Sequence, residues 1–149
     1  MEKQEIWDSI VVKINKTCDK LSMPIDEGIK ETVIVLQVLG FNTTQSCEGH
    51  DGRGLPYPWI MIECGNDSPY KDIQIAEYLE EFYSTYKPLK WARLSLNHFK
   101  GGFRLQSYIG RTAEKFKQSN LEEYEIVRKN CSKEMREFTI FLKEKFLNQ

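Results

Sequence analysis

Apolar residues recur every four positions near the start of the chain. Ile6, Ile10 and Ile14 have this spacing, which places their side chains on one face of a helix. The pattern predicts a helix over residues 3–20. It ends before Met23-Pro24, because proline lacks a backbone donor and does not continue a helix.

A second helical pattern follows, with Ile29, Val33 and Leu36 on one face. Asp26 stands before it, and an aspartate oxygen can accept a hydrogen bond from a free N–H group of a first helical turn. Gly40 follows the pattern and is typical of the residue that ends a helix. We therefore expect a helix between Asp26 and Gly40.

Residues 41–46 and 59–64 are rich in strand-forming side chains, and an irregular segment separates them. Residues 51–58 contain glycines and prolines that favour bends over regular structure. Two strands joined in this way are predicted to pair antiparallel.

The second half of the chain predicts one more helix and a second hairpin. Ser68-Pro69 is typical of a helix start, and Lys87-Pro88 ends the apolar pattern that follows. Residues 91–99 and 103–109 alternate in polarity around Lys100-Gly101-Gly102, which predicts a hairpin.

A final helix is predicted to begin with a capping box formed by Ser119 and Glu122. The predicted order is then α-α-β-β-α-β-β-α. Two hairpins separated by a helix predict an α+β fold, with a single antiparallel sheet of about four strands and helices packed on it. The length of 149 residues fits a single domain over residues 1–149.

Alternation along the two later strands separates an apolar sheet face from a polar one. The apolar face is predicted to carry Leu94, Leu96, His98, Phe103, Leu105 and Ile109, and the polar face Trp91, Arg93, Ser95, Asn97, Arg104, Gln106 and Tyr108. One interpretation is a solvated outer face. The other is that Arg93 and Arg104 line an anion pocket, because a guanidinium can bind a carboxylate or phosphate through two hydrogen bonds.

Composition and charge narrow the class of protein. The net charge of −1 argues against a protein that coats nucleic acid non-specifically. No apolar run follows the charged N-terminus, and none approaches the roughly 18 residues of a membrane span. We therefore expect a cytoplasmic protein without membrane association, whose four cysteines are reduced thiols.

The segment Ser46-Cys47-Glu48-Gly49-His50, followed by Asp51, concentrates reactive side chains. Cys47 could act as a nucleophile beside His50, and Glu48 could transfer protons. Ser46 and Asp51 would bind the ligand. The alternative is a structural turn in which Cys47 is a small buried hydrophobe.

Cys47 and His50 could also be two zinc ligands. Zinc takes four ligands, or three and a water molecule, so Cys64, His98 or Asp51 would have to complete the set. The chain has no second pair with metal-ligand spacing. Zinc is therefore one of several interpretations of this loop.

Residues 40–50, together with 54–59, resemble a segment found in small uncharacterised bacterial and phage proteins. Residues 24–26 and 28–30 fit the same pattern. This resemblance implies no particular activity.

More remotely, residues 44–49 are similar to a segment of the wybutosine-synthesis methyltransferase family, which modifies transfer RNA with S-adenosylmethionine. That family has its segment after a helix, at the entry to a sheet. Glu48 and His50 stand where that family has serine and arginine. The similarity implies a related local fold, and it implies RNA as one possible class of partner.

Two further hypotheses follow from the residues themselves. The first is a small ligand-binding protein or enzyme whose site lies where residues 46–51 meet the polar sheet face, with Arg93 and Arg104 binding an anionic metabolite or nucleotide. The second is a non-enzymatic interaction module that presents residues 55–59, or the final helix, to a protein partner. An enzyme predicts that Cys47, His50 and an arginine converge in one cavity.

Overall fold

The computed structural model describes residues 2–18, 22–52, 54–65, 70–111 and 113–149. Its helices and strands follow the predicted order, with the short helices η1 and α4 as additions before the last helix. The elements are α1 (Lys3–Asn15), α2 (Glu27–Val38), β1 (Asn42–Cys47), β2 (Trp59–Glu63), α3 (Lys71–Thr85), β3 (Leu94–Phe99), β4 (Gly102–Ser107), η1 (Tyr108–Arg111), α4 (Ala113–Ser119) and α5 (Leu121–Leu147).

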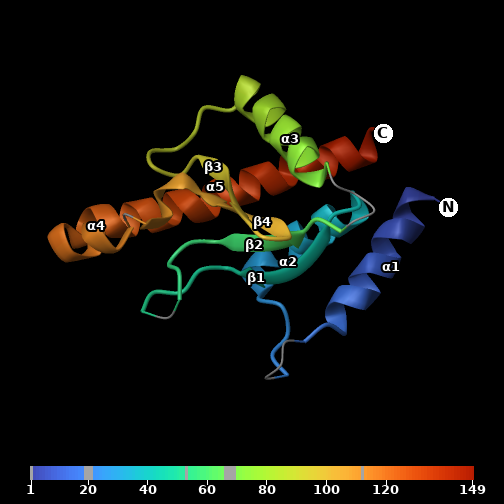
Figure 1. Cartoon of the computed structure of the whole chain (residues 1–149), viewed down its shortest axis with the longest axis horizontal. Helices are drawn as coiled ribbons and strands as arrows, with labels where there is room; N and C mark the ends of the chain where they lie inside the picture. Colours follow the sequence, from blue (N-terminus) through green and yellow to red (C-terminus); the bar gives the residue numbers. More distant parts are fainter. Residues whose placement is uncertain (1, 19–21, 53, 66–69, 112) are drawn as a thin grey trace.

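The four strands form one antiparallel sheet in the order β1-β2-β4-β3 (Figure 1). This confirms the predicted α+β class and both predicted strand pairs. Cys47 lies opposite Trp59, which in turn lies opposite Gln106. Directly opposed residues share a face, so these three side chains form a row at one end of the sheet.

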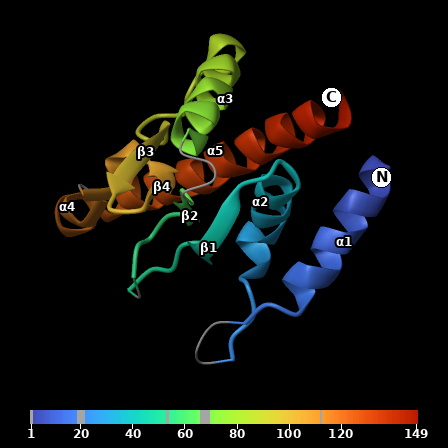
Figure 2. The same cartoon turned by 45° about the vertical axis from the view of Figure 1, so that its right-hand side comes forward.

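Helices α2 and α5 cover one face of the sheet, and α1 packs on α2 (Figures 1 and 2). The large apolar side chains that β2 and β4 turn toward this layer are fully buried: Ile60, Ile62, Phe103 and Leu105. They form one core with Leu36 of α2 and Phe138 of α5. Burial of each large apolar side chain contributes roughly 1.5–3 kcal/mol, so this layer is a main source of stability.

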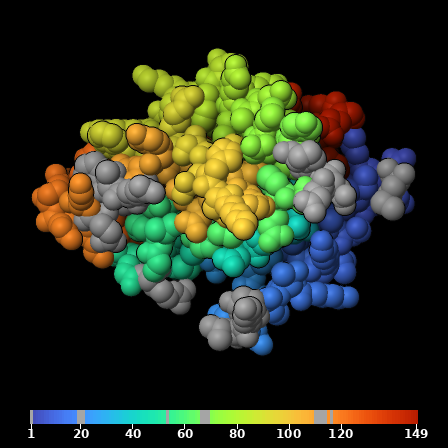
Figure 3. Space-filling model, viewed as in Figure 1, coloured from blue at the N-terminus to red at the C-terminus, as the bar shows by residue number. Residues whose placement is uncertain are grey.

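The opposite face carries half-buried side chains, and atoms of β3 and β4 lie at the molecular surface in Figure 3. Trp59, Met61, Arg104 and Gln106 belong to this face by register. The predicted separation of an apolar and a polar face is confirmed for the residues that lie within β3 and β4. Trp91, Tyr108 and Ile109 lie outside both strands, because β3 begins at Leu94 and β4 ends at Ser107.

Two predicted helix boundaries are wrong. The first helix ends at Asn15 and does not continue to residue 20. Asn120, not Ser119, caps the last helix: its side chain accepts a 3.1 Å hydrogen bond from the Glu123 N–H. Ser119 ends α4 and donates its hydroxyl to the Lys115 carbonyl, so it is occupied by the preceding turn. The predicted helix start at Ser68-Pro69 lies outside the described residues.

A buried carboxylate joins α5 to α3 and to the chain that enters β3. Glu134 is fully buried and accepts hydrogen bonds from the Tyr83 hydroxyl (2.7 Å) and from the Leu89 N–H (3.2 Å). The Tyr83 oxygen in turn accepts from the Leu94 N–H at 2.7 Å. This network satisfies a group whose unpaired burial would be costly.

Helix α5 has 27 residues and carries charged side chains along its outer face. Among the described residues, no helix is both long enough and apolar enough to cross a lipid bilayer.

Candidate functional site

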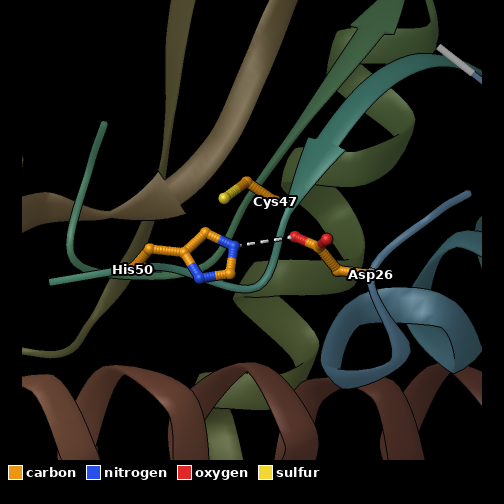
Figure 4. Close-up of side chains that lie close together, drawn as sticks. All are labelled: Asp26, Cys47 and His50. Atoms are coloured by element: carbon orange, nitrogen blue, oxygen red, sulfur yellow. Dashed lines mark hydrogen bonds and ion pairs between the residues drawn. The ribbon is translucent and has the colours of Figure 1, made fainter. Parts of the chain in front are cut away.

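Asp26, Cys47 and His50 converge where β1 leaves the sheet (Figure 4). Asp26 directly precedes α2, Cys47 is the last residue of β1, and His50 follows in the loop. One ligand atom from each residue lies within 4.8 Å of the other two. The His50 Nε2 lies 3.2 Å from the Asp26 Oδ2.

Element lengths explain this convergence. Gly40 has a φ of +92° and lets the chain turn from α2 directly into β1. Helix α2 has 12 residues, which span about 18 Å at 1.5 Å per residue. Strand β1 has six residues, which span about 20 Å at 3.3 Å per residue. The start of α2 therefore lies beside the end of β1.

Asp26 occupies the N-cap position predicted for it, but its side chain does not cap the helix. The Asp26 Oδ2 accepts a 3.1 Å hydrogen bond from the backbone N–H of Glu48 and also meets His50. Glu48 takes over the capping role, because its Oε2 accepts from the Gly28 N–H at 2.8 Å. The two carboxylates thus tie the loop to the start of α2.

Two glycines allow this close approach. A Cβ at Gly28 would lie 2.1 Å from the Glu48 Oε2. Gly49 has a φ of +93°, and a Cβ there would lie 2.7 Å from the backbone of Tyr57. A side chain at Gly28 would displace the Glu48 carboxylate, and one at Gly49 would displace the backbone of the loop that carries Cys47 and His50.

Asp51 fixes the next part of the loop to α4 and α5. Its Oδ1 accepts hydrogen bonds from the Lys117 Nζ (2.9 Å) and from the Tyr124 hydroxyl (2.8 Å). These bonds lower the pKa of the Asp51 carboxyl. Asp51 was predicted as a ligand-binding residue or a zinc ligand, and the structure places its carboxylate on these two partners.

The Cys47 sulfur has surroundings that disfavour a free thiolate. Burial raises the pKa of the thiol, the Gly49 N–H (3.3 Å from Sγ) opposes this shift, and the charge of Asp26 and its hydrogen bond with the thiol add to it. In Figure 4 the sulfur and the Asp26 carboxylate both lie near the Nε2 edge of the His50 ring. In a nucleophile–histidine–carboxylate triad, the two groups contact different ring nitrogens. The arrangement therefore differs from a proton relay.

The same three atoms suit a metal ion. Zinc binds cysteine sulfur, histidine nitrogen and carboxylate oxygen at about 2.0–2.3 Å, so neighbouring tetrahedral ligand atoms lie about 3.4–3.6 Å apart. The 3.2 Å between His50 and Asp26 is close to this spacing. Three protein ligands leave one coordination position open.

Cys64 and His98, predicted as further zinc ligands, lie toward the other end of the sheet. Cys64 follows β2, whose first residue, Trp59, is opposite Cys47. Five residue steps lead from Trp59 to Cys64, which corresponds to roughly 16 Å along an extended chain. The His98 Nε2 instead contacts the Asp72 Oδ2 at 3.3 Å.

The two predicted anion-binding arginines rest on different aromatic rings. The Arg104 guanidinium lies 4.7 Å from the ring centre of Trp59, and that of Arg93 lies 4.2 Å from the ring centre of Tyr83 on α3. Trp59 is the direct neighbour of Cys47, so Arg104 is the closer of the two by register. Ser46 pairs with the buried Ile60. Because opposed residues share a face, the Ser46 side chain points toward the core face of the sheet.

A groove of about 230 Å³ separates the loop from α5. It is lined by Gly49, Pro56, Glu125, Arg128, Lys129, Ser132 and Arg136. Sequence reasoning missed these α5 residues and the role of Asp26. The helical spacing of residues 125, 128, 129, 132 and 136 shows a common face, but no sequence pattern says that the loop lies against it.

Comparisons with family models, with curated proteins and with solved structures found no match to this chain.

Proposed function

We propose that the protein binds a divalent metal ion of the zinc class through Asp26, Cys47 and His50, and presents it to a small-molecule ligand. The supporting observation is the convergence of three unlike ligand atoms from the start of α2, the end of β1 and the following loop. Sulfur, imidazole nitrogen and carboxylate oxygen together form a ligand set that zinc accepts readily.

The open coordination position indicates the kind of chemistry. Structural zinc sites are closed by four protein ligands, whereas catalytic sites keep one position for water or substrate. A bound metal would supply Lewis acidity at that position and would keep Cys47 as a thiolate. Glu48, predicted as an acid or base, is a positioning residue here, because its carboxylate holds the Gly28 N–H.

The rival interpretation is a structural loop in which Asp26 only ties residues 47–50 to α2. The two interpretations differ in metal content. We expect about one zinc ion per chain in protein purified without chelator, and loss of that ion in Cys47→Ala. Elemental analysis of the purified protein measures this directly.

Cys64→Ala is the matched control, since Cys64 is also half-buried and also adjoins a strand end. It should keep the metal, and circular dichroism should show that both variants remain folded. Cobalt-loaded wild type should also show a thiolate-to-metal charge-transfer band that Cys47→Ala lacks. Wild type that takes up no zinc or cobalt would leave the structural loop as the correct interpretation.

A further inference from the structure

The groove beside the loop has an excess of positive charge. Arg128, Lys129 and Arg136 line it from α5, with Glu125 as the acidic residue among them. Three cations and one carboxylate leave a net charge of about +2. A phosphomonoester carries about −1.5 to −2 at neutral pH and offers three acceptor oxygens, so its charge complements the groove.

The cations differ in how they are held. Arg128 is fixed by two hydrogen bonds to Glu125, at 3.1 and 3.2 Å, and lies 5.8 Å from the ring centre of Tyr124. Its buried Nε has no acceptor among the described residues. Within the same described part of the chain, Lys129 and Arg136 form no ion pair. Two cations are therefore free to bind an anion beside a third that is already ordered.

The groove is smaller than most ligand sites. Sites for drug-sized ligands usually measure about 300–1,000 Å³, whereas this one measures about 230 Å³. Its size suits one anionic group with the rest of the molecule outside. Gly49 forms one wall of the groove and precedes His50 in the chain, so the groove lies beside the loop that carries two of the proposed metal ligands.

We propose that the groove between the loop at Gly49 and Pro56 and helix α5 binds the phosphate group of a small phosphorylated substrate. This inference rests on the proposed metal site for the direction in which the substrate points. The phosphate site itself depends only on the groove. The two proposals can therefore fail separately.

The experiment is a calorimetric titration of the purified chain with inorganic phosphate at low ionic strength, carried out with and without added zinc. We expect saturable binding that weakens as salt is added. Lys129→Gln and Arg136→Gln should each lower the affinity by about tenfold or more, because each removes a charge-assisted hydrogen bond. Zinc content should not change in either variant.

Lys133→Gln is the control, since Lys133 is exposed on α5 but does not line the groove. It should bind phosphate as wild type does, and acetate at matched ionic strength should bind more weakly than phosphate. His50→Ala, which removes a proposed metal ligand, should keep phosphate binding. Loss of phosphate binding in His50→Ala would place the anion on the metal and overturn the inference, as would groove variants with unchanged affinity.

Discussion

At the residue scale, the loop depends on an exchange of roles between two carboxylates. Glu48 caps α2 through the Gly28 N–H, and this leaves Asp26 free to bind the loop backbone and His50. A carboxylate that only capped the helix would face the helix N–H groups and not the imidazole. Asp26 is thus available as a ligand because Glu48, 22 positions further along the chain, caps the helix in its place.

Gly49 provides a test of how tightly this loop is fitted. Gly49→Ala should destabilise the fold by about 1–3 kcal/mol, because alanine at φ +93° is strained and its Cβ would meet the Tyr57 backbone. Urea unfolding measures the change, and zinc affinity should fall with it.

Gly52→Ala is the matched control in the same loop. Its φ is +75°, but a Cβ there meets nothing within 4 Å, so only the backbone strain of about 1–2 kcal/mol applies. An equal loss of free energy of unfolding in the two alanine variants would show that the contact with the Tyr57 backbone does not contribute to the destabilisation.

At the element scale, α3, α5 and β3 are joined by hydrogen bonds as well as by apolar packing. The Tyr83 hydroxyl donates to Glu134 of α5 and accepts from the N–H of Leu94, the first residue of β3. Burial, together with the bond to Glu134, raises the pKa of the Tyr83 hydroxyl. The protonated hydroxyl is therefore the form that the fold stabilises.

Tyr83→Phe should lower the free energy of unfolding by about 1–3 kcal/mol at pH 8, because it leaves buried polar groups unpaired. The pKa in the folded state lies above the ordinary value of about 10, so the stabilisation by the hydroxyl is complete below pH 10 and is lost as the pH rises further. The difference in the free energy of unfolding between wild type and Tyr83→Phe should then narrow by up to about 1.4 kcal/mol per pH unit.

Urea unfolding at pH 8 and above pH 10 measures both effects. Tyr108→Phe is the control, since Tyr108 is 78% exposed and should change stability little at either pH. A constant gap between wild type and Tyr83→Phe across this pH range would contradict the role assigned to Tyr83.

At the scale of the whole molecule, the proposed metal would link the start of helix α2 to the end of strand β1 in the sheet. Asp26 belongs to the entry of α2, and Cys47 and His50 to the exit from β1. A ligand that binds only the folded state stabilises it by mass action, by about 2.7 kcal/mol when its free concentration is one hundred times its dissociation constant.

We therefore expect a chelator to lower the melting temperature of zinc-loaded protein, and added zinc to restore it. His50→Ala should melt at the same temperature with and without chelator, because one of the three ligands is missing. Calorimetric melting of both proteins measures the shift. A chelator effect that persists in His50→Ala would place the stabilising metal elsewhere.

The expected location in the cytoplasm and the remote similarity to the wybutosine-synthesis methyltransferase family stay predictions. RNA retention at low salt, lost steeply as salt rises, is the observation that would support an RNA partner.

The sequence by itself determined the elements and their order, because helical and strand periodicity are written in neighbouring residues such as Ile6 and Ile10, or Leu94 and Leu96. It also pointed to Cys47 and His50, which are three positions apart, as candidate site residues. Only the tertiary structure decided that Asp26 joins them and that Arg128 and Arg136 face the loop. These contacts depend on how α2, β1 and α5 pack, and packing between distant segments leaves no local pattern in the chain.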